Sequence, residues 1–259
     1  MGPKKYWGQN FLRNQGAADR IVAAIEPAED EIVLEIGPGE GALTEKLAAL
    51  GRKTMAIEID PELVARLGER FAGRIEIVQG DAVEAPLPEL PYRAAGNLPY
   101  NAGTPILRRI ITDPNCRRAV FMLQKEVADR LVAKPDSEAY GYLTLYTALF
   151  ASARVLMTLD PGSFFPRPKV RSAVVVLDPR PPAIASEREV LLDLISASFR
   201  MRRKQLVNNL TGWHGLPRGD VLEAMKLAGI GPNARAETLA LEDFDRLAIW
   251  TAAARRRFE

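Results

Sequence analysis

Residues 97–100, with the sequence Asn-Leu-Pro-Tyr, have types and a spacing that suit chemistry on a flat substrate. A short apolar run ends there in an amide, a proline and an aromatic ring. Pro99 has a fixed φ and favours an extended Leu98, so the Leu98 carbonyl and the Asn97 side-chain oxygen can point into one pocket. Tyr100 would supply a flat wall. Without its surroundings the stretch also fits an ordinary strand-to-helix turn with a buried tyrosine.

Seven short apolar runs are predicted to be the strands that position this stretch. They cover residues 31–36, 53–59, 75–79, 92–96, 118–124, 153–159 and 173–177. Helical patterns separate most of them, and Asp60 followed by Pro61 is a strong helix start. The alternation predicts an α/β fold, with a mostly parallel sheet covered by helices on both faces. Ligands bind at the carboxyl ends of the strands in such sheets.

Four candidate features follow predicted strands and therefore meet at one edge of the sheet. They are the glycine loop at residues 37–42, Glu58, Asp81 and Asn97. Glycines let the backbone approach a ligand closely, and a carboxylate after the second strand binds ribose hydroxyls. The loop fits a dinucleotide-binding oxidoreductase and a methyltransferase alike. Since an oxidoreductase does not predict Asn-Leu-Pro-Tyr after the fourth strand, we favour a methyltransferase, with Asp81 accepting from an adenine amino group.

A loop at residues 163–172 contains two aromatic residues and two prolines. The prolines hold the loop extended, which leaves Phe164 or Phe165 available to stack on a planar group. A proline-rich connector with buried rings is the alternative.

The C-terminal part differs in composition from the rest of the chain. Residues 179–182, Pro-Arg-Pro-Pro, predict a domain boundary, after which only helical patterns occur. The run at residues 200–204 holds four cations: Arg200, Arg202, Arg203 and Lys204. Such a run is usually a solvated face, but beside a nucleotide-modifying domain it favours contact with phosphates.

Composition excludes several kinds of chemistry. The 259 residues contain one cysteine and one histidine, which argues against zinc sites built from Cys and His and against a Cys-His nucleophile pair. The formal net charge is only +2, so any binding of nucleic acid must use local patches. No apolar run is long enough to cross a bilayer, and residues 1–5 lack an apolar signal core. We therefore expect a cytoplasmic protein that contacts no membrane.

The chain resembles the ribosomal RNA adenine dimethyltransferases, most closely those of the bacterial small subunit. The matching stretches are residues 8–12, 35–39, 80–82, 96–100 and 124–127, with further matches in the second half. The resemblance implies a Rossmann-like, seven-stranded S-adenosylmethionine-dependent catalytic domain at residues 1–180. A small all-α RNA-binding domain at residues 181–259 would follow it.

The resemblance also implies the residues of the site. Cofactor contacts are expected at Gln9, Asn10, Leu12, Gly37, Gly39, Glu58, Ile59, Asp81, Ala82 and Asn97. Catalytic roles are expected for Asn97, Leu98, Pro99, Tyr100 and Phe164, with Phe164 preferred to Phe165. RNA contacts are expected from the basic run. No metal is expected, because a sulfonium methyl group is already activated.

The expected reaction is dimethylation of adenine N6, with S-adenosylhomocysteine as the second product. The implied substrate is a pair of adjacent adenosines in a hairpin loop near the 3′ end of 16S rRNA, within the small ribosomal subunit, and the implied state is a monomer. Two alternatives stay open: a 23S rRNA adenine methyltransferase of the macrolide-resistance type, and a non-catalytic ribosome assembly factor that keeps this fold.

Overall fold

The computed structural model describes residues 9–255, with side chains described for residues 9–251. Contacts divide the chain into two compact units, one comprising Met1–Ala128 and Ala151–Arg180, the other Asp129–Phe150 and Pro181–Glu259. The first unit ends at the residue where the sequence predicts a boundary. The contact units differ from the predicted division in the segment Asp129–Phe150, which belongs to the second unit. Its Tyr140 hydroxyl donates to the Leu239 carbonyl at 2.6 Å, a partner 99 residues away.

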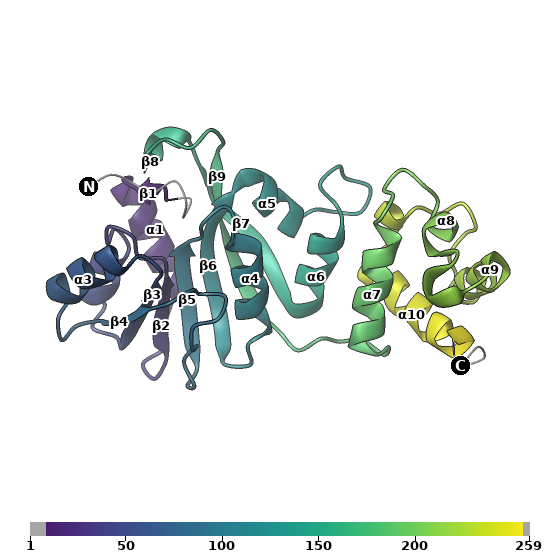
Figure 1. Cartoon of the computed structure of the whole chain (residues 1–259), viewed down its shortest axis with the longest axis horizontal. Coiled ribbons are helices and arrows are strands. Elements are labelled where there is room, and N and C mark those ends of the chain that lie inside the picture. Colours follow the sequence, from purple (N-terminus) through teal and green to yellow (C-terminus); the bar gives the residue numbers. More distant parts are fainter. Residues whose placement is uncertain (1–8, 256–259) are drawn as a thin grey trace. The chain divides into compact units, whose positions relative to one another are not determined.

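Seven strands of the first unit form one sheet among the described residues, in the order β4-β3-β2-β5-β6-β9-β7 (Figure 1). The first five strands in this order, from β4 through β3, β2 and β5 to β6, pair in parallel. In contrast, β9 is antiparallel to both of its neighbours, β6 and β7. The strand bounds are β2 Ile32–Ile36, β3 Thr54–Glu58, β4 Glu76–Gln79, β5 Tyr92–Asn97, β6 Cys116–Gln124, β7 Ala151–Leu159 and β9 Ser172–Pro179. Each of the seven predicted strands is present.

A second, two-stranded ladder was not predicted. It joins β1 (Phe11–Leu12) to β8 (Phe164–Phe165) in antiparallel register, with Phe11 opposite Phe165 and Leu12 opposite Phe164. Two residues are too short for an alternating pattern, so sequence periodicity cannot reveal such strands.

The central strands β2 and β5 approach each other at a glycine. Gly96 pairs with Ile36, and a Cβ at position 96 would lie 2.3 Å from the Ile36 carbonyl oxygen. The Ile36 carbonyl belongs to backbone held in the sheet, and a Cβ is fixed to the backbone of residue 96, so neither could turn away to make room. Residue 96 must therefore be glycine for β5 to run beside β2 up to Asn97.

Helices of the first unit cover both faces of the sheet. Their bounds are α1 Gln15–Ile25, α2 Thr44–Ala49, α3 Pro61–Arg70, α4 Gly103–Thr112 and α5 Lys125–Leu131, the last of which continues into the second unit. The α1 helix starts at Asn14, whose side chain accepts from the Ala17 amide at 3.0 Å. The α3 helix starts as predicted at Asp60, which caps the Glu62 amide at 3.1 Å, with Pro61 in the first turn.

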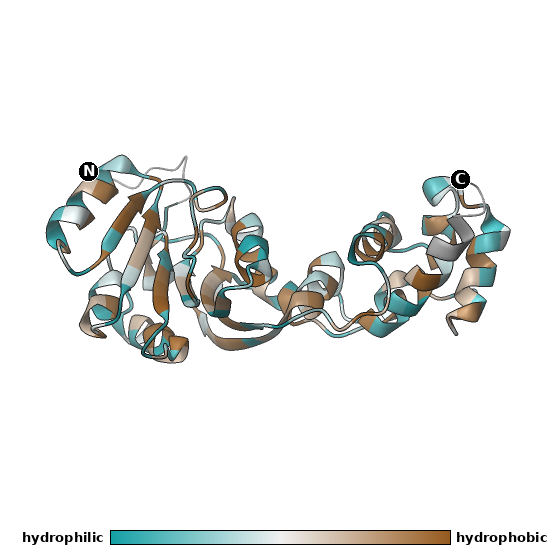
Figure 2. Ribbon diagram, turned by 90° about the horizontal axis from the view of Figure 1, so that it is seen from below, coloured by the Kyte–Doolittle hydropathy of each residue, from teal (hydrophilic) through white to brown (hydrophobic). Residues whose placement is uncertain are grey.

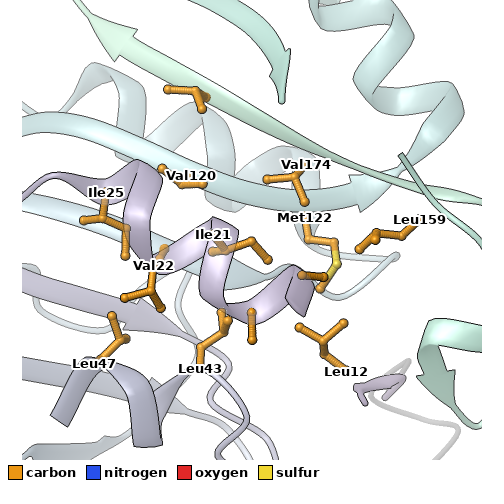
Figure 3. Packing of buried hydrophobic residues seen from close by; sticks show 14 of the residues in the cluster. Leu12, Ile21, Val22, Ile25, Leu43, Leu47, Val120, Met122, Leu159 and Val174 are labelled. Atoms are coloured by element: carbon orange, nitrogen blue, oxygen red, sulfur yellow. The ribbon is translucent and has the colours of Figure 1, made fainter. Parts of the chain in front are cut away.

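The main hydrophobic core lies between α1 and the sheet. Figure 3 shows side chains of α1 and of the region around α2 packed against Val120, Met122 and Val174 of β6 and β9. Successive strand residues project to opposite faces, so Leu123 points the other way and lies against α4 near Gly103. The middle of the sheet is thus buried on both faces, which explains why strands such as β2 and β9 are nearly continuous apolar runs, whereas the edge strands β4 and β7 are partly exposed.

The second unit consists of helices. Their bounds are α6 Tyr142–Phe150, α7 Arg188–Ser198, α8 Leu206–Leu210, α9 Arg218–Leu227 and α10 Leu241–Arg255. Figure 2 shows hydrophobic and hydrophilic residues alternating along these helices, as expected for helices with one buried side. None of the described helices is long and apolar enough to cross a membrane.

Candidate functional site

A cavity of about 350 Å³ opens at the carboxyl ends of β2, β3 and β5. Ligands of parallel α/β sheets bind at this edge, and the volume is at the lower end of the range of small-molecule sites. The cavity brings together most of the sequence-predicted residues, namely Gln9, Asn10, Gly37, Gly39, Glu58, Ile59, Asp81, Ala82, Asn97, Leu98, Pro99 and Tyr100. The predicted convergence of four strand ends is therefore present in the structure.

Sequence reasoning missed several residues of the cavity wall, namely Phe11, Ile36, Ile57, Gly80, Asn101, Ala102 and Ile106. All but Ile106 lie within two positions of a predicted residue, so widening each motif would have found them. Ile106 lies on the first turns of α4, and only the placement of that helix brings it to the cavity.

The glycine loop is shaped to approach a ligand closely. Gly37 and Gly39 have φ of 65° and 58°, a backbone region that L side chains rarely adopt. The Gly37 amide donates to the Ile57 carbonyl at 2.9 Å, which ties the loop to β3. A Cβ at position 39 would lie 2.8 Å from Cδ1 of Phe11. The absence of side chains thus leaves room for the Phe11 ring at the cavity wall.

Glu58 is a buried carboxylate that holds the loop in place. Its Oε2 accepts from the Gly39 amide at 3.1 Å, and its Oε1 accepts from the Asp60 amide at 3.0 Å. Burial raises the pKa of Glu58, and these amide donors offset part of the rise. Carboxylate oxygens have further lone pairs, so the group can also accept from hydroxyls of a ligand in the cavity.

Asp81 lies at the end of β4, where its Oδ1 accepts from the Val83 amide at 2.9 Å. This bond fixes the carboxylate at the rim of the cavity, and none of the described residues donates to Oδ2. The apolar side chains of Ile59 and Ala82 lie at the same wall. Together they form a slot with apolar sides and one acceptor, an arrangement suited to a purine with an exocyclic amino group.

Asn97 has its amide oriented by the chain segment before α1. Its Nδ2 donates to the Asn10 carbonyl at 2.6 Å. Because the nitrogen is committed to this bond, Oδ1 is the atom left to accept from a ligand, and none of the described residues donates to it. Gly96 allows β5 to continue to this point, as described above.

Leu98 contributes its backbone. The Leu98 amide donates to the Met122 carbonyl at 3.0 Å, and its side chain is buried. No described residue donates to the Leu98 carbonyl. Pro99 follows and cannot donate through its backbone nitrogen. Two neighbouring residues of the cavity wall therefore carry an acceptor to which none of the described residues donates: Asn97 Oδ1 and the Leu98 carbonyl.

Tyr100 is half-buried at the cavity wall, with its hydroxyl 3.2 Å from Ser172 Oγ. Burial raises the pKa of Tyr100, so the phenol stays neutral in the physiological range. Ser172, the buried first residue of β9, was not among the predicted site residues. It fixes the direction of the tyrosine ring and thereby the flat wall.

Two predicted residues lie outside the wall of this cavity. Leu12 and Phe164 face each other across the β1–β8 ladder, and both belong to the main hydrophobic core, in which Figure 3 labels Leu12. Leu12 lines a smaller neighbouring cavity of about 30 Å³. Phe164 is 3% exposed, whereas Phe165 is 55% exposed. The preference for Phe164 as the available ring therefore finds no support in this geometry, because strand alternation turns it into the core.

Glu35 lies in β2 beside the smaller cavity and has an unusual environment. It is buried, and its Oε2 has no partner among the described residues. Burial raises the pKa of Glu35 to about 8, the Glu58 carboxylate adds to the rise, and Thr44 offsets part of it. The side chain is therefore mostly protonated at neutral pH.

Glu35→Gln is expected to remove a pH dependence of stability. The pKa of Glu35 is higher in the folded state than in the unfolded chain. The protonated side chain therefore contributes fully to the unfolding free energy below about pH 4.5, and this contribution is lost as pH rises through about 8. The wild type should lose on the order of 3 kcal/mol of unfolding free energy between pH 5 and pH 8 through this group. Urea unfolding without cofactor measures the difference.

Glu76→Gln is the matched control, since Glu76 is an exposed strand residue of the same unit. It should leave the pH dependence unchanged. Parallel pH profiles for the wild type and Glu35→Gln would contradict the assignment.

The predicted basic run lies in the second unit, in the turn between α7 and α8, and all four cations are exposed. They are not equivalent. Arg202 Nη2 donates to the carbonyls of Glu138 and Tyr140, at 2.6 and 2.9 Å, so Arg202 holds a neighbouring loop. The side chains of Arg200, Arg203 and Lys204 have no partner among the described residues and are exposed, so they can contact phosphates.

The described part of the chain contains no group of three or more His, Cys, Asp or Glu side chains placed to hold a metal ion.

Residues 3–253 match the family model described as "Ribosomal RNA adenine dimethylase". This chain belongs to that family. The match covers both units. The fold and the family together assign the chain to the S-adenosylmethionine-dependent methyltransferases.

Named relatives are similar over nearly the whole chain. The "Ribosomal RNA small subunit methyltransferase A" of Methylococcus capsulatus is 44% identical over 93% of this chain and 95% of its own. A dimethyladenosine transferase from Plasmodium falciparum has a similar structure, with a TM-score of 0.84 at 26% identity, covering 94% of this chain and 98% of its own. The 23S rRNA methyltransferase ErmE has a TM-score of 0.72 at 30% identity, covering 93% and 99%.

The residues of the cavity fit the cofactor of this family. The glycine loop leaves open backbone at the end of β2, Glu58 can accept from ribose hydroxyls, and Asp81 can accept from the adenine amino group.

Proposed function

We propose that this protein transfers methyl groups from S-adenosylmethionine to N6 of two adjacent adenosines near the 3′ end of 16S rRNA. The target would be a hairpin loop in the assembling small subunit, and the enzyme would act as a cytoplasmic monomer. One observation carries the reaction type: the acceptors Asn97 Oδ1 and the Leu98 carbonyl lie unpartnered at the cavity. The 44% identity to a relative named for the small subunit supports the choice of RNA.

Adenine N6 is a poor nucleophile because its lone pair is delocalised into the ring. The two N6 hydrogens can donate to Asn97 Oδ1 and the Leu98 carbonyl, which favours a more tetrahedral nitrogen with a localised lone pair. Tyr100 would stack on one face of the base, and its neutral hydroxyl stays bound to Ser172. When bound, S-adenosylmethionine supplies an already electrophilic methyl group, so the protein mainly positions and polarises the reactants.

The cofactor would be held by the glycine loop, Glu58 and Asp81, with Gln9 and Asn10 on the side of the segment before α1. The Asn97 side chain would then lie between the cofactor and the target adenine. Its nitrogen donates to Asn10, which would contact the cofactor, and its oxygen would accept from adenine N6. No metal has a role in this scheme. After transfer, the methylated nitrogen would lose a proton to solvent, and S-adenosylhomocysteine would leave from the same cavity.

The target base must leave its stack before it can reach the cavity, so loops and single strands are favoured over duplex RNA. The basic run on the second unit would hold the phosphates of the RNA. Such contacts position the substrate but carry no sequence information.

The double variant Arg203→Ala with Lys204→Ala is expected to weaken RNA binding in a salt-dependent manner. Each cation releases about one counterion on binding, so the slope of log K against log salt should fall by about 2. Affinity for the cofactor should not change. Filter binding across a salt series measures this effect. Arg202 is left intact, because its loss would also release the loop at Glu138 and Tyr140.

Arg188→Ala with Lys226→Ala removes the same charge from exposed positions of the second unit outside the run. This control should keep the wild-type slope. An equal loss in both double variants would show that net charge, not the basic run, governs RNA binding.

The function is tested by incubating the protein and labelled S-adenosylmethionine with unmethylated small and large subunits separately. Digestion of the RNA to nucleosides then identifies the product. Label recovered as N6,N6-dimethyladenosine from the small subunit supports the proposal. Label only in the large subunit would favour the reaction named for ErmE. Binding without label in either subunit would favour a non-catalytic assembly factor.

A further inference from the structure

Phe165 is an exposed aromatic ring held on a rigid strand. Among the described residues it shares the highest exposure of the large apolar side chains with Leu90, at 55% each. Its backbone pairs with Phe11 in the β1–β8 ladder, so the ring projects from fixed structure and not from a free loop. Exposing such a ring needs a reason, because aromatic side chains are usually buried or in contact with a partner.

The ladder places this ring next to the catalytic cavity. Residues opposite each other in an antiparallel pair project to the same side, with Cβ atoms about 5 Å apart. Leu12 and Phe164 form the side turned into the core, so Phe11 and Phe165 form the other side. Phe11 lines the cavity. The exposed ring therefore lies one side chain away from the cavity wall.

One cation lies over the ring, and other basic residues follow it in the same loop. The Arg13 guanidinium carbon lies 5.8 Å from the Phe165 centroid, and Glu40 steadies that guanidinium at 2.6 Å. Arg167 and Lys169, in the same loop, are exposed and have no partner among the described residues. Arg171 is paired with Asp160 at 2.9 Å. An aromatic face with one cation over it and further basic residues in the same loop matches the chemistry of a nucleotide, whose base stacks while its phosphate pairs with cations.

We propose that Phe165 and Arg13 form a stacking platform for the nucleotide next to the target base, with Arg167 and Lys169 binding its phosphates. This inference rests on the proposed RNA substrate and deepens it. The base that enters the cavity has left its stack, and its neighbour loses a stacking partner at the same step. Phe165 replaces that partner beside the cavity.

Phe165→Ala tests the platform in the full-length protein. Loss of one base–aromatic stack should raise KM for the RNA about tenfold and leave affinity for S-adenosylmethionine unchanged. Stem-loop RNAs with 2-aminopurine on either side of the target adenosine report stacking directly. The wild type should quench one of these probes, Phe165→Ala should not, and Phe165→Tyr should restore the quench.

Leu90→Ala is the matched control, since Leu90 is equally exposed and precedes β5 at the opposite end of the strands. It should behave as the wild type does. Phe165→Leu separates stacking from simple apolar contact, because leucine lacks a π face. Full activity and binding of Phe165→Leu would overturn the platform and indicate a protein partner for this surface. Unchanged KM and quenching in Phe165→Ala would overturn it as well.

These outcomes are independent of the proposed reaction. If the wild type methylates the small subunit and Phe165→Ala does so with the same KM, only the platform fails. If the wild type methylates neither subunit, the proposed reaction fails, and quenching of a single-stranded 2-aminopurine oligonucleotide still tests the platform.

Discussion

Asn97→Ala is expected to lower the rate of methyl transfer by about two to three orders of magnitude. Removal of one positioned hydrogen-bonding group at a reacting centre has an effect of this size. The variant loses one of two acceptors for adenine N6 and also the bond to the Asn10 carbonyl. Single-turnover transfer to small subunits measures the step without contributions from product release.

The fold and cofactor affinity of the variant must be measured beside the rate. Thermal unfolding should change little, because Asn97 lies at the end of β5 and not in its buried middle. Asn97→Asp keeps an acceptor oxygen but cannot donate to the Asn10 carbonyl, so a partial rate would separate the acceptor from the orienting bond. A near-normal rate of methyl transfer by Asn97→Ala would contradict the proposed role of the amide.

Gly96→Ala is expected to have the largest effect on stability. A Cβ at this position would lie 2.3 Å from the Ile36 carbonyl oxygen, and backbone of two paired strands cannot move apart locally. Overpacking of a rigid site costs about 1–3 kcal/mol or more, and here the clash is with backbone. We expect a loss of at least about 3 kcal/mol, or failure of the first unit to fold. Urea unfolding measures it.

Gly68→Ala provides the matched control for this substitution. Gly68 lies inside α3 with nothing within 4 Å of an added Cβ, and alanine is favoured in a helix interior. This variant should gain up to about 1 kcal/mol. Wild-type stability in Gly96→Ala would mean that β2 and β5 can separate more easily than their pairing indicates.

The sheet and its edge of candidate residues could be predicted because their signals are local. Buried strands such as β2 and β3 are continuous apolar runs, and the helix start at Asp60 and Pro61 needs only two neighbouring residues. Once the strands alternate with helices, topology brings their carboxyl ends together without further information. Glu58, Asp81 and Asn97 reached the same cavity for this reason.

The features that sequence reasoning missed depend on partners far away in the chain. The β1–β8 ladder decides which of Phe164 and Phe165 is buried, and no periodicity can show a two-residue strand. Arg202 looks equivalent to Arg203 in the sequence, yet it binds carbonyls more than 60 residues away. The segment Asp129–Phe150 reads as part of the first domain because only tertiary packing assigns it to the second unit.

The β1–β8 ladder also bears on the order of folding. Its two residue pairs join the segment before α1 to the loop before β9, with most of the first unit between them in sequence. Contacts of such long sequence separation carry a large loop-closure entropy and are formed late. Phe11 and the Asn10 carbonyl, which complete the cavity, belong to the segment that this ladder fixes. We therefore expect the cavity to be completed after the parallel part of the sheet, so that binding of the cofactor depends on closure of this ladder.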